Sequence, residues 1–175
     1  MAEAGYRFTV VEPKLTEPTW VHPGLSSAVH AESLAYFKAQ SVASAHPAET
    51  ILAADTIAVV EGRTVGKPVD LDDARRILHA LSGKDHSVIT GVVLLQVATD
   101  RRMLQHNITK VRFRELTDEM IEAYLRTGKW KGKAGAYGIQ DQDDPFVQSI
   151  AGSFTNVMGL PMELLAQMLE HWVGA

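Results

Sequence analysis

The chain has 175 residues, of which 46% are hydrophobic, and a formal net charge of −4. This length and composition suit one domain with a sizeable core, and the slight acidity argues against nucleic acid as a partner. The absence of cysteine excludes disulfides and zinc–thiolate sites. No apolar run reaches membrane-spanning length and the N-terminus lacks a signal-peptide pattern, so we expect a cytoplasmic protein with no membrane partner.

The first half of the chain alternates between strand and helix patterns, which indicates the α/β class. Asp70 is placed to cap a helix that Gly83 ends. In chain order we expect a strand over 6–11, a helix over 27–45, a buried strand over 50–60 that turns back at Glu61-Gly62, and a helix over 71–81.

The second half continues the alternation without a linker or an internal repeat, so we expect a single domain over 1–175. In the later strand, Thr109, Val111 and Phe113 alternate with basic residues, which predicts one wet face. The spacing predicts strands over 86–97 and 103–114, a helix capped by Thr117 that ends at Thr127, and a closing helix from Pro161 to Trp172.

The most informative segment is KWKGKAGAYGIQ, residues 129–140, in which every third position from Gly132 to Gly138 is glycine. Such a segment cannot form a stable helix interior, and its backbone is free to make left-handed turns and close approaches. Its lysines, Lys131 and Lys133, are charges suited to phosphate oxygens. The pattern therefore suggests a phosphate-binding loop.

Asp55 stands in the middle of an otherwise apolar strand, ILAADTIAVV. A lone buried carboxylate is costly unless it is paired or binds a cation. Two interpretations stay open: a structural aspartate that caps a neighbouring turn, or a metal ligand or general base facing a cleft. Its neighbour Thr56 is, from this pattern alone, an ordinary β-branched strand residue.

Three further charged residues have both an ordinary and a functional interpretation. Lys38 shares a helical stripe with alanines, so its ammonium either snorkels to solvent or projects into a polar pocket. Lys67 lies in a rigid Gly-Lys-Pro turn, which is also common on surfaces. Glu17 lies between prolines and by default would be solvated. The histidines show no metal-binding spacing, which favours solvated or core roles for them.

Taken in order, the motifs ILAADT, VGKPVD, LSGKDHSVITGV, GKWKGKAGAYGIQ and GSFTNVMGLP resemble the Maf family of nucleoside triphosphate pyrophosphatases. The resemblance runs from about Tyr6 to Trp172. It implies a single Maf/ITPase-like α/β domain with a mixed, twisted sheet flanked by helices and two lobes around a nucleotide cleft. It also implies a cytoplasmic homodimer that hydrolyses a nucleoside triphosphate to the monophosphate and pyrophosphate with Mg²⁺ or Mn²⁺.

Carried over by position, the resemblance assigns Asp55 as the catalytic carboxylate and proton acceptor, and Glu17 as its companion at the metal. Lys38 and Lys67 match phosphate-facing lysines, and Lys133 matches the lysine of the Lys-Ala-Gly block. The pair Thr56 and Gln140 matches two positions associated with base choice. Threonine with glutamine there resembles the branch acting on dTTP and UTP rather than the branch acting on 7-methyl-GTP.

One departure from the family pattern bears on activity. Family members open with a strand ending in Ser-x-Ser-Pro-Arg-Arg, and that strand and phosphate loop are missing from this sequence. Loss of a bidentate arginine at a triphosphate lowers the rate on the order of 10²–10⁴. We therefore also expect, as an alternative, a weak or inactive nucleotide-binding regulator. A module that has kept the fold but lost the ligand is a more distant alternative.

Overall fold

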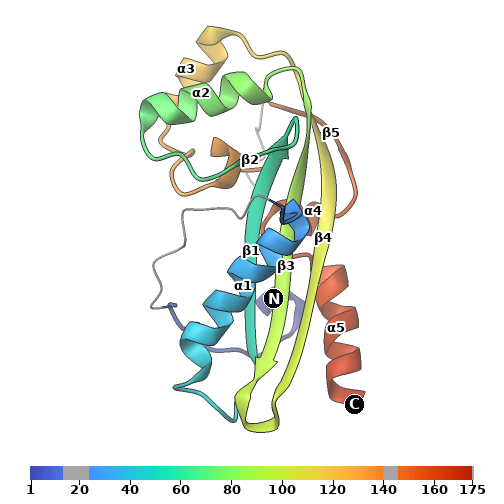
Figure 1. Ribbon diagram of the computed structural model, residues 1–175. Helices are drawn as coiled ribbons and strands as arrows, with labels where there is room; N and C mark the ends of the chain where they lie inside the picture. The colour runs from blue at the N-terminus through green and yellow to red at the C-terminus, as the bar shows by residue number, and fades with distance from the viewer. Residues whose placement is uncertain (14–23, 140–145, 175) are drawn as a thin grey trace.

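One twisted sheet of five strands runs through the molecule (Figure 1). The computed structural model describes residues 1–13, 24–139 and 146–174. The strands, in the spatial order β2-β1-β3-β4-β5, are β1 (Ile51–Val60), β2 (Arg63–Val65), β3 (Asp85–Gln96), β4 (Arg101–Phe113) and β5 (Val147–Ala151). Every ladder within the described residues is antiparallel. The resemblance implied a mixed sheet; here short hairpins join β1 to β2 and β3 to β4, and a hairpin makes its strands antiparallel.

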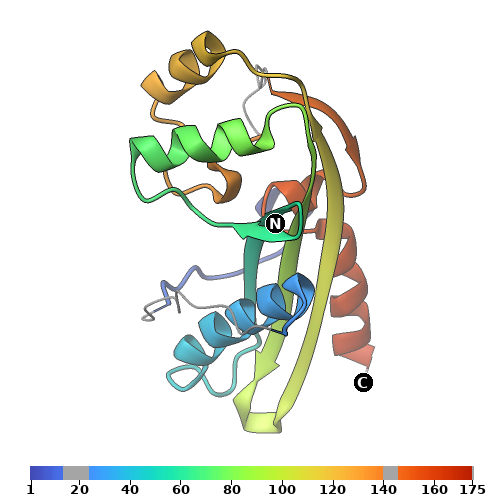
Figure 2. The ribbon, with the colours of Figure 1, turned by 45° about the horizontal axis from the view of Figure 1, so that its top comes forward.

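The helices surround the sheet in two groups (Figures 1 and 2). Helices α1 (Ser27–Ala43) and α5 (Met162–Gly174) cover opposite faces of its lower part. Helices α2 (Leu71–Leu81) and α3 (Asp118–Arg126) pack together over its upper end, where they form an upper lobe with β2. The remaining elements are the short helix α4 (Phe154–Val157) and the 3₁₀ turns η1 (Ala2–Ala4), η2 (Val97–Thr99) and η3 (Ala134–Ala136). Within the described ranges, no helix is long and apolar enough to cross a membrane.

The predicted caps and turns are confirmed. Asp70 accepts a hydrogen bond from the backbone N–H of Asp73 at 2.8 Å, and Thr117 accepts one from Met120 at 3.3 Å. Glu61 and Gly62 both have positive φ, at 49° and 75°, which is the backbone of the tight hairpin turn that matches strand twist. The helix and long-strand boundaries predicted from periodicity agree with the structure to within about two residues.

Some sequence predictions were wrong or incomplete. Residues 6–11 form no strand, and Val10 is 79% exposed, because the segment lies outside every ladder of the described sheet. The short elements β2, β5 and α4 were not predicted. Each has five residues or fewer, too short for a periodic pattern to be recognised.

Small residues bring α1 unusually close to the sheet. Ala31, Ala35, Ala39 and Ala43 lie at four-residue intervals and are at most 1% exposed, so they form one buried helical stripe. Opposite them on β3 is Gly91, where a Cβ atom would lie only 2.4 Å from backbone atoms of Ala31. The absence of a side chain at Gly91 is therefore what permits this approach.

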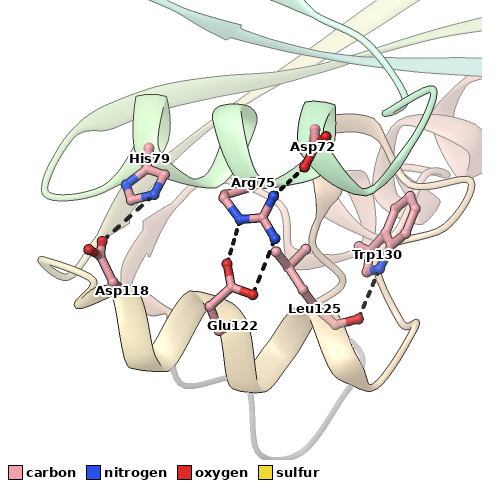
Figure 3. A network of polar contacts seen from close by, with 7 residues as sticks. All are labelled: Asp72, Arg75, His79, Asp118, Glu122, Leu125 and Trp130. Carbon is pink, nitrogen blue, oxygen red and sulfur yellow. Dashed lines mark hydrogen bonds and ion pairs between the residues drawn. The ribbon is translucent and has the colours of Figure 1, made fainter.

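The upper lobe is tied together by polar contacts between α2 and α3 (Figure 3). Arg75 donates to both carboxylate oxygens of Glu122 and to Asp72. The indole N–H of Trp130 donates to the carbonyl of Leu125 at 3.1 Å, and this tryptophan is 7% exposed. The bond anchors the start of the glycine-rich segment to the end of α3.

Candidate active site

A cleft opens at the free edge of β1. Because β2 pairs with β1 only at Ala58, Val59 and Val60, no strand covers this edge from Ile51 to Ile57 in the described part of the chain. A cavity of about 270 Å³ lies there, walled by α1, β1, the glycine-rich segment and the turn after α4. A larger groove of about 830 Å³ continues along the edge and shares Lys38 and Ala54 with it.

Asp55 and Lys38 meet at one wall of this cavity. Side-chain alternation along β1 directs Asp55 toward α1, and Asp55 is paired in register with Gly91. Lys38 follows Ala31 by two helical turns, so the close approach at Gly91 also brings its ammonium onto the Asp55 carboxylate, which it contacts as an ion pair. The two side chains are 18% and 8% exposed, so the Lys38 ammonium projects into the cavity wall instead of snorkelling to solvent, and the Asp55 carboxylate is buried with a cation beside it.

The glycine-rich segment and the Gly-Lys-Pro turn each bring a lysine to the cavity. Gly135 has a φ of 75° and donates its N–H to the carbonyl of Gly66 at 3.1 Å. This bond joins the Lys-Ala-Gly block to the Gly-Lys-Pro turn, and Lys67 and Lys133 both line the cavity. A Cβ at Gly138 would lie 2.2 Å from Nζ of Lys133, so the lysine packs across that glycine.

A buried histidine holds Tyr137, another cavity-lining residue. Nε2 of His86 lies 2.8 Å from the Tyr137 hydroxyl, and the two rings pack edge to face at 5.5 Å. Burial lowers the pKa of His86 to about 4, opposed by the nearby charge of Asp85. The imidazole is therefore neutral at pH 7 and supports Tyr137 from the core, which is one of the two roles, solvated or core, that the sequence favoured for the histidines.

Thr56 lies on the opposite face of β1 from Asp55. Its hydroxyl lies 2.8 Å from that of Thr90, the residue directly across on β3. Beside it runs the turn after α4, where a Cβ at Gly159 would lie 3.6 Å from the Thr56 Oγ1. Asp55 and Thr56 therefore line the same cavity from opposite faces of β1.

The structure thus brings together five of the residues predicted as site residues: Asp55, Lys38, Lys67, Lys133 and Thr56 all line the one cavity. Glu17 and Gln140 lie outside the described residues. Sequence reasoning did not assign Tyr137, His86, Thr90 or Asn156 to the site or its surroundings. His86 and Thr90 could have been noticed as polar residues inside an otherwise apolar strand, and Asn156 as the asparagine of the motif GSFTNV. The sequence does not show which groups these side chains contact.

The charges of the cavity suit a polyanion. Among the described residues that line it, there are three lysines and one carboxylate. No group of three histidine, aspartate or glutamate residues converges anywhere in the described ranges. This donor set does not form a complete cage for a metal, but it fits Mg²⁺ or Mn²⁺, because such ions are commonly held by one or two carboxylates together with substrate phosphates.

Comparison with known proteins decides the family. The sequence pattern of a family described as Maf-like protein matches residues 1–172. The chain belongs to the Maf family. The fold predicted from the resemblance, an α/β domain with two lobes around a cleft, is confirmed, with the strand directions reported above.

Curated relatives within this family carry one functional name. The chain is 46% identical over 140 residues to a protein of Ruminiclostridium cellulolyticum named dTTP/UTP pyrophosphatase, covering 80% of this chain and 72% of the relative. Proteins with the same name from Symbiobacterium thermophilum and Bdellovibrio bacteriovorus are 42% and 40% identical, each over 98% of this chain and over 87% and 91% of their own lengths.

Proposed function

We propose that this chain is a nucleoside triphosphate pyrophosphatase that hydrolyses UTP and dTTP to the monophosphate and pyrophosphate. The observation that carries the proposal is the convergence of Lys38, Lys67 and Lys133 on one cavity with the buried carboxylate of Asp55. The shared name of the relatives supports the substrate class. The same convergence disfavours an inactive nucleotide binder, since binding alone requires no buried carboxylate among the lysines.

In the proposed reaction, water attacks the α-phosphorus and the bond to the pyrophosphate leaving group breaks. Asp55 accepts the proton of the attacking water, because it is the one carboxylate among the described residues that line the cavity. Lys67 and Lys133, on the two loops that the Gly135–Gly66 bond holds together, neutralise the charge that moves onto pyrophosphate. Lys38 orients Asp55 through their ion pair and contacts phosphate when the nucleotide is bound.

A divalent ion fits this arrangement. Asp55, with Glu17 as the predicted second ligand, would hold Mg²⁺ or Mn²⁺ together with the substrate phosphates. The ion would supply charge neutralisation and polarise the phosphates. We expect chelation by EDTA to abolish turnover and added Mg²⁺ to restore it.

The decisive test is pyrophosphate release by the purified chain with Mg²⁺ across UTP, dTTP, CTP, GTP and 7-methyl-GTP. We expect turnover of UTP and dTTP, and a loss on the order of 10²–10⁴ in Asp55→Asn. Asp100→Asn is the matched control: Asp100 lies in the β3–β4 hairpin with a φ of 51°, which asparagine also adopts. Full activity of Asp55→Asn, or no turnover of any nucleotide, would refute the proposal.

The finer features implied by the resemblance stay predictions. We expect a homodimer, which light scattering on the purified protein would measure, and a cytoplasmic location, which cell fractionation would measure. The reaction class follows from the products: release of inorganic pyrophosphate rather than orthophosphate would place the enzyme among the nucleoside triphosphate diphosphatases.

A further inference from the structure

The free edge of β1 shares a groove with the N-terminal arm (residues 7–11). Residues 51–54 of β1 and all five residues of the arm line this groove of about 830 Å³. Every second residue of an edge strand points its N–H and C=O away from the sheet. No backbone group of the arm is hydrogen-bonded to another described residue. Both walls of the groove therefore carry the donors and acceptors that strand pairing uses.

The arm is apolar and exposed, although its sequence has the alternation of a strand. Phe8, Val10 and Val11 are 52%, 79% and 44% exposed. Single exposed apolar side chains are ordinary, but three within four residues form a patch that is usually covered. An extended arm of five residues is roughly 17 Å long. It therefore matches the uncovered part of β1 in length as well as in character.

The root of the arm is fixed beside β1. Met1 packs against the apolar cluster that includes Leu52 and Ala54 of β1 and Leu165 of α5. The N–H of Tyr6 donates to the carbonyl of Met1 at 3.3 Å. A short tether of this kind keeps the arm at a high effective concentration near the edge. Pairing within one chain is therefore favoured over pairing with a second copy.

The apolar pattern decides which way a paired arm faces. Neighbouring residues of a strand point to opposite faces of the sheet, so Phe8 and Val10 share one face and Arg7 takes the other. The α5 face beside β1 holds the apolar cluster that the arm's root contacts, so Phe8 and Val10 would be buried there. Arg7 would then lie on the α1 face, which carries the ion pair of Lys38 and Asp55.

Charge favours an open arm without a ligand and a closed arm with a polyanion. Arg7 and Lys38 line the same groove, and Lys38 also lines the cavity together with two further lysines. Bringing another cation toward these lysines costs free energy, because like charges repel. A triphosphate between them reverses the sign of that interaction. A ligand shifts a conformational equilibrium by its differential affinity for the two states, and here only the closed state brings Arg7 to the phosphates.

We propose that the arm pairs with the free edge of β1 when a nucleoside triphosphate binds, and that Arg7 then contacts the phosphates. The inference rests on the proposed function, because the nucleotide is what closes the arm. The groove meets the cavity at Lys38 and Ala54. Closure of the arm therefore also shields the Asp55 side of the cavity from water.

Hydrogen exchange measured by mass spectrometry tests the closure. The probe is α,β-methylene-UTP with Mg²⁺, in which a methylene group replaces the bridging oxygen at the bond that the proposed reaction breaks. We expect this probe to slow amide exchange about tenfold in residues 7–11 and in residues 51–55, and UMP to leave residues 7–11 unchanged. Slower exchange in residues 51–55 alone, or no change in either segment, would overturn the inference. Slowing that increases with protein concentration would assign the arm to a second copy and would also overturn it.

Two substitutions separate the pairing from the charge. Val10→Asn puts a polar side chain on the apolar face of the arm but disturbs little in the open state, where Val10 is exposed. Arg7→Gln removes the cation alone. We expect each variant to abolish the slowing in residues 7–11 and to raise KM for UTP about tenfold. Melting temperatures without nucleotide should agree within a few degrees.

Each variant has a matched control outside the groove and the cavity. Val173→Asn changes a valine of α5 that is 83% exposed, and Arg102→Gln changes an exposed arginine of β4. Both controls should keep the slowing and the KM of the unchanged protein. Normal KM and normal slowing in Arg7→Gln or in Val10→Asn would overturn the inference. Absence of UTP turnover in the unchanged protein would instead count against the proposed function.

Discussion

Gly91→Ala should impair both folding and catalysis, because Gly91 lies where β3 touches α1. A Cβ added there would lie 2.4 Å from the carbonyl carbon and oxygen of Ala31 and from the nitrogen of Glu32. All three are backbone atoms, so no side-chain rotation relieves the contact. To reach an ordinary separation of about 3.4 Å, α1 must retreat from the sheet by about 1 Å.

The retreat acts on two measurable quantities. Overpacking of a tight core contact costs about 1–3 kcal/mol, and contacts with backbone atoms belong at the upper end of that range. Lys38 lies on the same helix two turns further on, and its partner Asp55 is in register with Gly91. A displacement of about 1 Å at a reacting group lowers the rate about 10²-fold.

The assay combines urea unfolding with pyrophosphate release at a temperature where the variant is fully folded. Gly174→Ala is the control, because a Cβ at Gly174 meets no atom within 4 Å. If Gly91→Ala matches the control in both measurements, the close packing described here is wrong. A loss of stability with full activity would show that α1 can move without displacing Lys38.

Three further outcomes are expected. In Gly138→Ala the three atoms nearest the new Cβ all belong to the flexible end of Lys133, so turnover should fall while the melting temperature changes little; a large drop in melting temperature would contradict this. Lys38→Met should lower turnover and destabilise the fold by about 3 kcal/mol, since it leaves the Asp55 carboxylate buried without this cation. Adding Asp55→Asn to this variant should restore stability but not activity. A double variant no more stable than Lys38→Met would refute the reasoning. Between pH 6.5 and about 4 the unfolded chain binds a proton at His86 that the folded chain does not, so the free energy of unfolding should fall by about 3 kcal/mol as pH drops through this window. His86→Gln should lack that part of the decrease in urea titrations at pH 7.5 and 4.5, and an unchanged pH dependence would contradict the assignment.

Periodicity and capping signals were strong enough to predict the long elements. The α2 pattern combines an aspartate cap, an apolar stripe and a glycine end, and the structure follows it from Leu71 to Leu81. The segment over 6–11 carries the same alternation as a true strand but forms none. A strand exists only where a neighbour pairs with it, and pairing partners are not written in a local pattern.

For the candidate site, the residue types pointed to the chemistry and the resemblance pointed to the positions. Asp55 could be recognised because a carboxylate in an apolar strand requires a reason. Its partner could not be recognised, because the contact with Lys38 depends on a glycine and an alanine stripe that let α1 approach the sheet. Likewise nothing near Thr56 in the sequence indicates Thr90 or Asn156, which are 34 and 100 residues further along the chain.

Local order and composition therefore sufficed for the α/β class and the long helices and strands, and they suggested that the glycine-rich segment binds phosphate. Folding was needed to establish which strands pair, how close α1 lies to β3, and which hydroxyl the Thr56 side chain meets. The reason is physical: helix and strand periods arise from neighbours within a few residues. Ion pairs, tight backbone contacts and buried hydrogen-bond chains instead join residues that only the packed sheet brings together.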